Sequence, residues 1–315
     1  MKRKILPFVL LVSLLAALLA ACATASSPIG KPEQATAPEA TPLTFQDGLD
    51  RRVELTGPAQ RVVSLAPSNT EILFAVGAGS QVVGRDDFSD YPAEAASLPS
   101  VGGSFSDYNY EAIVDLKPDL VLAAEINTPE QVQALEKLGL KVYYLANPTD
   151  LEGMYTNLQI VAALTGHEAE TKQLIDSLRQ RVAAVEAKLQ NMDQEPLVFY
   201  EIDATDPNAP YTAGKGTFID TLIGMAKGRN LGATLNEPYG SISLEELVVQ
   251  NPDIILLGDS VWGGVTAESV ASRPGWDQVG AVKNGKIYPF DDNLVSRPGP
   301  RMVDGLEALA ELLHG

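Results

Sequence analysis

The sequence predicts an α/β protein made of two Rossmann-like lobes, each built on a parallel sheet, joined by a single long helix. Predicted strands alternate with predicted helices on both sides of the middle of the chain, and this alternation is typical of parallel sheets. A short pattern occurs twice, at Glu111–Asp119 and at Glu245–Asp253. These observations divide the folded chain into an N-terminal lobe over 43–165, a bridging helix over 166–194 and a C-terminal lobe over 195–315.

The bridging helix is predicted from apolar residues that recur at steps of three or four. They are Leu174, Leu178, Val182, Val185 and Leu189. We expect Thr165 to be its N-cap, with Glu168 completing a capping box, and no Gly or Pro follows Gly166 before Pro196. Such a helix would span about 39 Å, at about 1.5 Å per residue, which is enough to bridge two lobes. The alternative is a long surface helix within one domain.

The first residues have the organisation of an export signal. Met1–Lys4 is basic, residues 5–21 are apolar, and Leu19–Cys22 resembles a cleavage site that ends in the one cysteine of the sequence. This segment resembles a bacterial lipoprotein signal, which implies that residues 1–21 are removed and that Cys22 is lipidated. Residues 22–42, rich in Ala, Ser, Pro and Thr, would then form a flexible tether. The alternative is an ordinary secretory signal with a cysteine nearby.

Composition limits the classes of partner and the means of stabilisation. The formal net charge is −18 at pH 7, so we expect the surface to repel nucleic acid and anionic lipid headgroups. One cysteine cannot form an intrachain disulfide, and packing must therefore stabilise the exported domain.

In the N-terminal lobe, an edge hairpin over 43–55 with Asp47-Gly48 at its turn precedes the alternating elements. The predicted strands are 61–65, 82–83, 119–123 and 141–145. The predicted helices begin with Ser68–Glu71, which has the form of a capping box, with Glu111, and with Thr128-Pro129. In the C-terminal lobe the predicted strands are 197–202, 253–257 and 286–290. Its predicted helices are 217–226, 243–249 and 301–313.

The repeated pattern places one glutamate at an equivalent position in each lobe. Glu111 precedes Pro118 by seven positions, Glu245 precedes Pro252 by seven, and an apolar strand follows in both cases. This spacing puts each glutamate at the start of a short helix that buries its apolar residues against the sheet, so the carboxylate stays outside. The alternative is that both carboxylates only complement helix dipoles.

The residues that most catalytic and metal sites need are missing or poorly spaced. His167 and His314 are the two histidines, no G-x-S-x-G pattern occurs, and Gly77–Gly79 and Gly214–Thr217 are incomplete phosphate-loop patterns. We therefore predict no enzymatic activity, no metal site and no cofactor.

Aromatic side chains gather in predicted loops. They are Phe88, Tyr91, Phe105, Tyr108, Tyr211, Tyr239 and Trp262. Loops after the strands of a parallel sheet form its ligand-binding edge, so these residues predict an aromatic cleft for a large, flat or partly apolar ligand. The alternative for each residue is ordinary loop packing.

Several stretches after Arg61 resemble one bacterial family. They are Ser64–Glu71, Asp90–Pro92, Glu111–Asp119, Asn208–Lys215, Arg273–Trp276 and Ser296–Arg301. The family comprises the ABC-transporter substrate-binding proteins for cobalamin, haem and ferric siderophores, which are class III periplasmic binding proteins. The resemblance implies a monomer with a ligand cleft between its lobes and a bridging helix that permits only small hinge motions. It also implies delivery of the ligand to an ABC permease dimer with its ATPase subunits.

The resemblance assigns roles to individual residues. Glu111 and Glu245 occupy the positions of the two glutamates that dock into arginine pockets of the permease, and Glu246 is the neighbour that could be confused with Glu245. The cobalamin-binding branch looks closest, because Phe88, Phe105, Tyr211, Tyr239 and Arg297 match its cleft residues in type. The full set of expected ligand-binding residues is Ser68, Phe88, Tyr91, Phe105, Tyr108, Tyr211, Tyr239, Trp262 and Arg297.

We therefore expect a binding protein that is lipid-anchored at the outer face of the cytoplasmic membrane or held in the periplasm, and that captures a corrinoid. The nearest alternative keeps this class and changes the ligand to a ferric siderophore or haem, whose iron Tyr91, Tyr108 or Tyr239 would bind. A second alternative is an exported hydrolase or adhesion module on the same scaffold.

Overall fold

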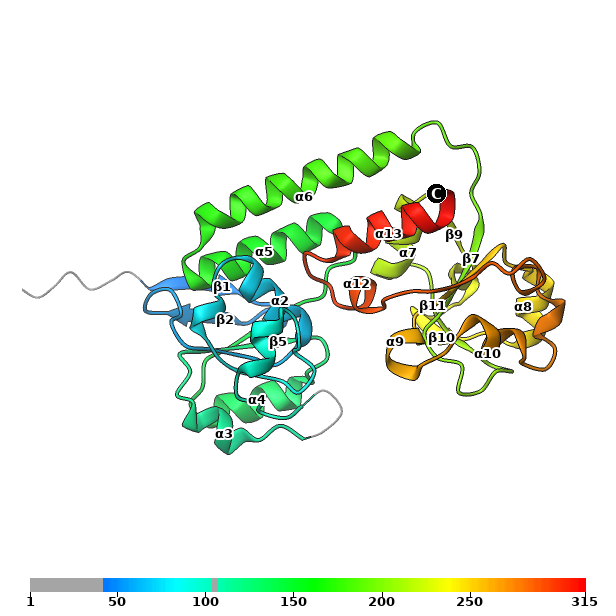
Figure 1. Ribbon diagram of the computed structural model, residues 1–315. Coiled ribbons are helices and arrows are strands. Elements are labelled where there is room, and N and C mark those ends of the chain that lie inside the picture. The colour runs from blue at the N-terminus through cyan, green and yellow to red at the C-terminus, as the bar shows by residue number, and fades with distance from the viewer. Residues whose placement is uncertain (1–41, 104–106) are drawn as a thin grey trace, which may run out of the picture. The chain divides into compact units, whose positions relative to one another are not determined.

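Two parallel sheets of four strands dominate the computed structural model, which describes residues 42–103 and 107–315 (Figure 1). The first sheet contains β3 (Val62–Ser64), β4 (Val82–Arg85), β5 (Leu120–Ala124) and β6 (Val142–Leu145). The second contains β7 (Leu197–Glu201), β9 (Arg229–Asn230), β11 (Ile254–Leu257) and β12 (Ile287–Pro289). Their spatial orders are β4-β3-β5-β6 and β9-β7-β11-β12, so both sheets read 2-1-3-4 when the strands are numbered along the chain. The predicted α/β fold with two Rossmann-like lobes is confirmed.

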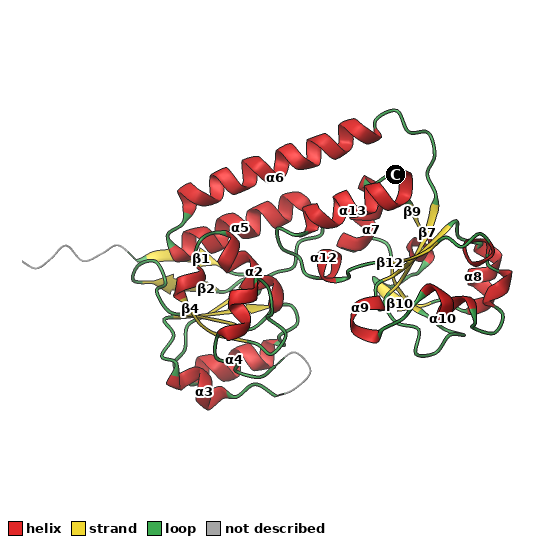
Figure 2. Cartoon of the chain, in the orientation of Figure 1, coloured by secondary structure: helices red, strands yellow, loops and turns green. Residues whose placement is uncertain are grey.

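Each sheet is buried on both faces, as parallel sheets usually are. Along β5, Leu120 and Leu122 face one apolar cluster, whereas Val121 and Ala123 face another. Short helices cover the outer face of each sheet (Figure 2). They are α3 (Tyr110–Asp115) and α4 (Pro129–Lys137) in the first lobe, and α8 (Leu244–Gln250), α10 (Ala267–Ala271) and α11 (Gly280–Lys283) in the second.

The inner faces of the two sheets belong to one continuous apolar cluster. It runs from Val62 of β3 through Ile175 and Leu178 of the bridging helix to Val198 of β7. The helices that build it are α2 (Pro67–Ala75), α5 (Leu151–Thr165), α6 (Glu168–Leu189), α7 (Phe218–Met225) and α13 (Met302–His314). The bridging helix, α6, packs along α5 and α13 (Figure 1). The lobes are therefore joined by a shared core as well as by the chain itself.

The start of the bridging helix was predicted wrongly. Thr165 is the last residue of α5, a helix that the sequence analysis missed, and its hydroxyl donates to the Val161 carbonyl (2.7 Å). Gly166 then adopts a left-handed conformation with φ 82°, and His167 precedes α6 without a side-chain cap. The predicted capping box does not form because Thr165 belongs to the last turn of α5, whose apolar periodicity continues up to that residue. The chain then reverses at Gly166 before α6 begins.

The capping box at Ser68–Glu71 is also wrong, although the helix itself is confirmed. α2 begins with Pro67 at its first position and has Ala66 as N-cap, with no side-chain hydrogen bond. Proline suits this position because a backbone N–H in the first turn has no acceptor within the helix, so its absence removes no hydrogen bond. Glu71 is instead buried against arginines from the C-terminal segment.

The remaining predicted elements are present. The hairpin pairs β1 (Leu43–Gln46) with β2 (Arg52–Leu55), and α4 starts at Thr128-Pro129 as predicted, with a capping box between Thr128 and Gln131. Besides α5, elements that were not predicted are β8 (Tyr211–Ala213), β9, β10 (Tyr239–Ser241), α9 (Ser260–Gly263), α10, α11, α12 (Asn293–Ser296) and short 3₁₀ turns at 79–81, 93–97, 231–234 and 276–278. The predicted export signal, Cys22 and Phe105 lie outside the described residues. Among the described helices, none has the length and hydropathy that crossing a membrane requires.

The turn between α5 and α6 predicts a clear stability effect. In Gly166→Ala, the new Cβ would lie 3.1 Å from a Pro58 carbon at a φ of 82°, and left-handed backbone costs a residue with a Cβ about 1–2 kcal/mol. We expect a loss of about that size in urea unfolding. The matched control is Gly224→Ala on the exposed face of α7, where a Cβ meets nothing within 4 Å and where helix propensity favours alanine by about 0.5–1 kcal/mol. Equal effects of the two changes would contradict this account.

Candidate functional site

A cavity of about 820 Å³ lies at the carboxyl ends of the central strands of both sheets. In a 2-1-3-4 sheet the chain order reverses between strands 1 and 3, and ligands bind outside the carboxyl ends at this point. Ala66 follows β3, Ile126 follows β5, Ile202 follows β7 and Val261 follows β11, and all four line the cavity. The cleft therefore lies where the two switch points meet, and its volume is within the range of about 300–1,000 Å³ that is usual for small-molecule sites.

Large apolar side chains line this cleft without being buried. Phe88 and Ile126 come from the first lobe and Val261 and Trp262 from the second, and Trp262 is 62% exposed. A group of neighbouring apolar side chains that remain exposed usually marks a binding surface. This combination predicts a ligand with a broad apolar face.

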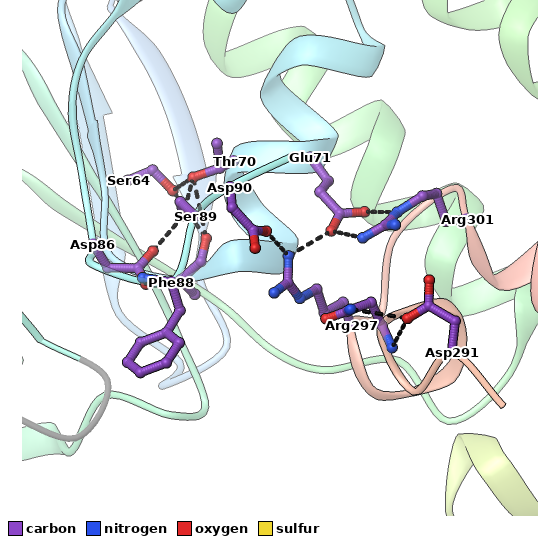
Figure 3. Close-up of polar contacts among 12 residues, drawn as sticks. Ser64, Thr70, Glu71, Asp86, Phe88, Ser89, Asp90, Asp291, Arg297 and Arg301 are labelled. Atoms are coloured by element: carbon purple, nitrogen blue, oxygen red, sulfur yellow. Dashed lines mark hydrogen bonds and ion pairs between the residues drawn. The ribbon is translucent and has the colours of Figure 1, made fainter. Parts of the chain in front are cut away.

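A chain of polar side chains fixes the loop that carries Phe88 (Figure 3). Buried Asp86 accepts hydrogen bonds from the Phe88 backbone N–H (2.9 Å) and from the Ser89 hydroxyl. The Ser89 hydroxyl lies 2.7 Å from that of Thr70 in α2, which donates to Ser64 at the end of β3 (2.8 Å). The loop is thus tied to the switch point and presents Phe88 and the following residues to the cleft.

Two arginines from the C-terminal segment meet acids of the first lobe beside the cleft (Figure 3). Arg301 donates to both carboxylate oxygens of Glu71, at 2.8 and 2.5 Å. Arg297 lies 2.6 Å from Asp90 and 3.4 Å from Glu71. Burial raises the pKa of Glu71, while the two arginines oppose this shift. This ion network joins α2 and the Asp90 loop to the segment between α12 and α13.

The structure places the predicted ligand-binding residues in different environments. Ser68, Phe88, Trp262 and Arg297 line the cleft. Tyr91 does not, because it lines a second cavity of about 730 Å³ with Phe74 and Leu178, and the Arg301 guanidinium lies 4.0 Å above its ring.

Tyr108 is a core residue, so its predicted place in the cleft is wrong. It is 6% exposed, and its hydroxyl donates to the Leu65 carbonyl (2.9 Å). Most other residues of the cleft lining were missed, among them Asp90, Ile126, Val261 and Asp292. Their signal in the sequence was position, because Ile126 and Val261 follow predicted strands.

Tyr211 and Tyr239 lie on a small antiparallel ladder, not in loops as predicted. Tyr211 pairs with Ser241 across β8 and β10, so Tyr239 is its diagonal neighbour on the same face. Burial, together with the nearby Asp292, Tyr211 and Glu125, raises the pKa of Tyr239 to about 12. Because Asp292 lines the cleft and Glu125 precedes Ile126, Tyr239 lies near the cleft edge and keeps its hydroxyl proton at neutral pH.

A buried acid pair supports the cleft from the second lobe. Glu201, at the end of β7, is fully buried and accepts two hydrogen bonds from Arg273, at 2.6 and 2.8 Å. Asp259, just before α9, is also buried, and burial followed by the charge of Glu201 raises the pKa of Asp259 to about 7. Within the described part of the chain, no group of three or more acidic, histidine or cysteine side chains could hold a metal ion.

Each copy of the repeated pattern contains an aspartate with a structural role and a glutamate without one. Asp119 accepts from the backbone N–H groups of Gln60 and Arg61 (2.8 and 2.9 Å), and Asp253 accepts from that of Leu197 (2.7 Å), so each aspartate fixes the start of its lobe's first strand. Glu111 and Glu245 are exposed in the first turns of α3 and α8, and among the described residues neither side chain has a partner. The repeated glutamates therefore remain available for an external contact.

The raised pKa of Asp259 predicts how its replacement changes stability with pH. An unfolded chain loses this proton near the ordinary value of 3.8, whereas the folded protein keeps it until about pH 7. Between these values the folded state binds more protons, so the contribution of Asp259 to stability falls as pH rises and is constant above about pH 7. The side chain at this position is neutral at every pH in Asp259→Asn. The thermal midpoint of the variant, relative to that of the wild type, should therefore rise from pH 4 to pH 7. A difference that does not change with pH would refute this assignment.

Comparisons with known proteins identify the class. Residues 62–294 match the family described as periplasmic binding protein. An uncharacterised ABC transporter substrate-binding lipoprotein of Bacillus subtilis, YvrC, is 33% identical over 307 residues, which cover 96% of this chain and 94% of the relative. A cobalamin-binding protein of Halobacterium salinarum is 30% identical over 283 residues, with coverage of 87% and 74%.

A solved structure supports the same fold. The periplasmic haem-binding protein RhuT of Roseiflexus sp. RS-1, in its apo form, superposes with a TM-score of 0.73 at 26% identity, covering 81% of this chain and 98% of that one. The agreement extends to the class III arrangement of two lobes. The chain belongs to the periplasmic binding protein family and is a substrate-binding protein of the ABC-importer type.

Proposed function

We propose that this protein captures a corrinoid in the cleft between its lobes and delivers it to an ABC permease. The observation that carries the proposal is the composition of the cleft, in which exposed apolar side chains from both lobes meet, with protonated Tyr239 near its edge. A corrinoid has a broad macrocycle that packs on such side chains and a rim of amides that accept hydrogen bonds from phenolic hydroxyls. The cobalamin-binding relative supports this choice.

Haem or a ferric siderophore is the second candidate, because the haem-binding RhuT has the same fold. A tyrosine that binds ferric iron does so as phenolate, and the raised pKa of Tyr239 opposes this form. Tyr91 lines a different cavity from the cleft, and Tyr108 is in the core. These features favour the corrinoid.

Anchoring and delivery complete the proposal. YvrC is named a lipoprotein, which supports lipidation of Cys22, removal of residues 1–21 and a tether over 22–42 that holds the two lobes outside the cytoplasmic membrane. Glu111 and Glu245 then dock into basic pockets of the permease dimer, one from each lobe. In this account the protein binds and releases its ligand without catalysis and acts as a monomer.

The tyrosine pair provides the test of the binding site. Tyr211→Ala and Tyr239→Ala should each weaken cyanocobalamin binding by about 1–2 kcal/mol, about 5–30-fold, because each removes an aromatic contact. Isothermal titration calorimetry measures the effect. The matched Tyr→Phe variants keep the ring and should lose less, which separates stacking from hydrogen bonding. Wild-type affinity in both alanine variants would place the ligand elsewhere.

Docking is tested by separating binding from transport. The double variant Glu111→Ala with Glu245→Ala should bind cyanocobalamin as the wild type does but should support no uptake in cells or in proteoliposomes that contain the permease. Glu246→Ala is the matched control, because Glu246 adjoins Glu245 but accepts a hydrogen bond from Gln250 (2.8 Å), and it should transport normally. Loss of ligand binding in the double variant would show that the docking assignment is wrong.

A further inference from the structure

We infer that Asp90 and Glu71 determine ligand specificity: they balance the charge of Arg297, so the cleft excludes ligands that carry carboxylates. This inference rests on the proposed function in that it takes the cleft as the ligand site. Among the described residues that line the cleft, Arg297 is the one basic side chain, whereas Asp90 and Asp292 are both acidic. Arg297 is thus the one cation in the lining with which a ligand carboxylate could pair.

The geometry shows that Arg297 is already engaged. One of its terminal nitrogens, Nη1, donates to Asp90 (2.6 Å) and lies 3.4 Å from Glu71 (Figure 3). The Arg297 side chain is 13% exposed and that of Glu71 is 1% exposed. Glu71 is in turn fixed by Arg301, which donates to both of its oxygens. If Glu71 moved away from Arg297, it would also break its ion pair with Arg301. A buried charge would then be left unpaired, which is costly.

Asp90 differs from Glu71 because its side chain is 65% exposed. It stands on the loop that Asp86, Ser89 and Thr70 tie to the switch point, so its carboxylate is held in front of Arg297. A ligand carboxylate entering the cleft would meet Asp90 and Asp292, and the charge of Arg297 would already be shared with Asp90 and Glu71 through Nη1. It would lose water without gaining a full ion pair, whereas a neutral amide avoids that cost.

This arrangement separates two classes of flat ligand. Haem carries two propionates, and a cobalamin carries neutral amides along its corrin rim. A cleft with a charge-balanced arginine favours the second class, and Asp90 is the exposed position at which this preference can be changed without disturbing a buried pair.

The test compares two ligands that differ by one charge. Cyanocobalamin and the monocarboxylic acid made by hydrolysing one of its side-chain amides are titrated into the protein by calorimetry. Wild-type protein should prefer the amide. Asp90→Asn removes the closer of the two carboxylates from Arg297 and should raise the relative affinity for the acid by about tenfold, the size of a net hydrogen bond to a charged group. Added salt should reduce this gain, because the contact is electrostatic.

Two control variants make the test specific. Glu94→Gln removes an exposed charge from the same loop region, away from the cleft lining, and should leave the ratio of affinities unchanged. Arg297→Gln combined with Asp90→Asn should abolish the gain. An unchanged ratio in Asp90→Asn, an equal change in Glu94→Gln, or a gain that survives loss of Arg297 would each overturn the inference.

Haemin distinguishes a failure of this inference from a failure of the corrinoid proposal. If cyanocobalamin does not bind, the corrinoid proposal fails, and the role of Asp90 is then measured with haemin on wild type and Asp90→Asn. A higher haemin affinity in the variant supports the inference, and an equal or lower affinity overturns it.

Discussion

The arrangement of this protein depends on one apolar core that two sheets share. Residues of β3 and β7 belong to the same buried cluster, and α6 contributes Ile175 and Leu178 to it. Burying a side chain of this size contributes about 1.5–3 kcal/mol, so opening the lobes widely would expose much of what stabilises both. We therefore expect a cleft above such a core to change its width only slightly.

The shared core explains why a cavity lies between the lobes. Each sheet has a switch point at the carboxyl ends of its central strands, and the two points line one cavity. The ion network of Glu71, Asp90, Arg297 and Arg301 joins the lobes beside that cavity with alternating charges. Because these groups mostly satisfy one another, the cleft presents apolar surface more than unpaired charge.

Much of the fold followed from local pattern, because buried parallel strands read as short apolar runs and the repeat marked two equivalent lobes. The errors arose where tertiary contacts override local signals. Glu71 looked like a helix cap, yet arginines more than two hundred residues away determine its position. Tyr108 and Phe88 both lay in predicted loops, and only packing showed that one is core and the other cleft. The pairing of Arg297 with Asp90 and Glu71 could not be predicted from the sequence, because these partners come from separate segments that meet only in the folded protein.

The most direct test of this account is a fluorescence titration of the soluble chain from Ala23 onward with cyanocobalamin, haemin and a ferric hydroxamate. Of the two tryptophans, Trp262 lines the cleft and Trp276 is fully buried, so a ligand in the cleft should quench the exposed one. The account predicts saturable one-to-one quenching by cyanocobalamin that is lost in Trp262→Phe, with weaker binding of haemin. Saturable binding of haemin or the hydroxamate without a response to cyanocobalamin would contradict it.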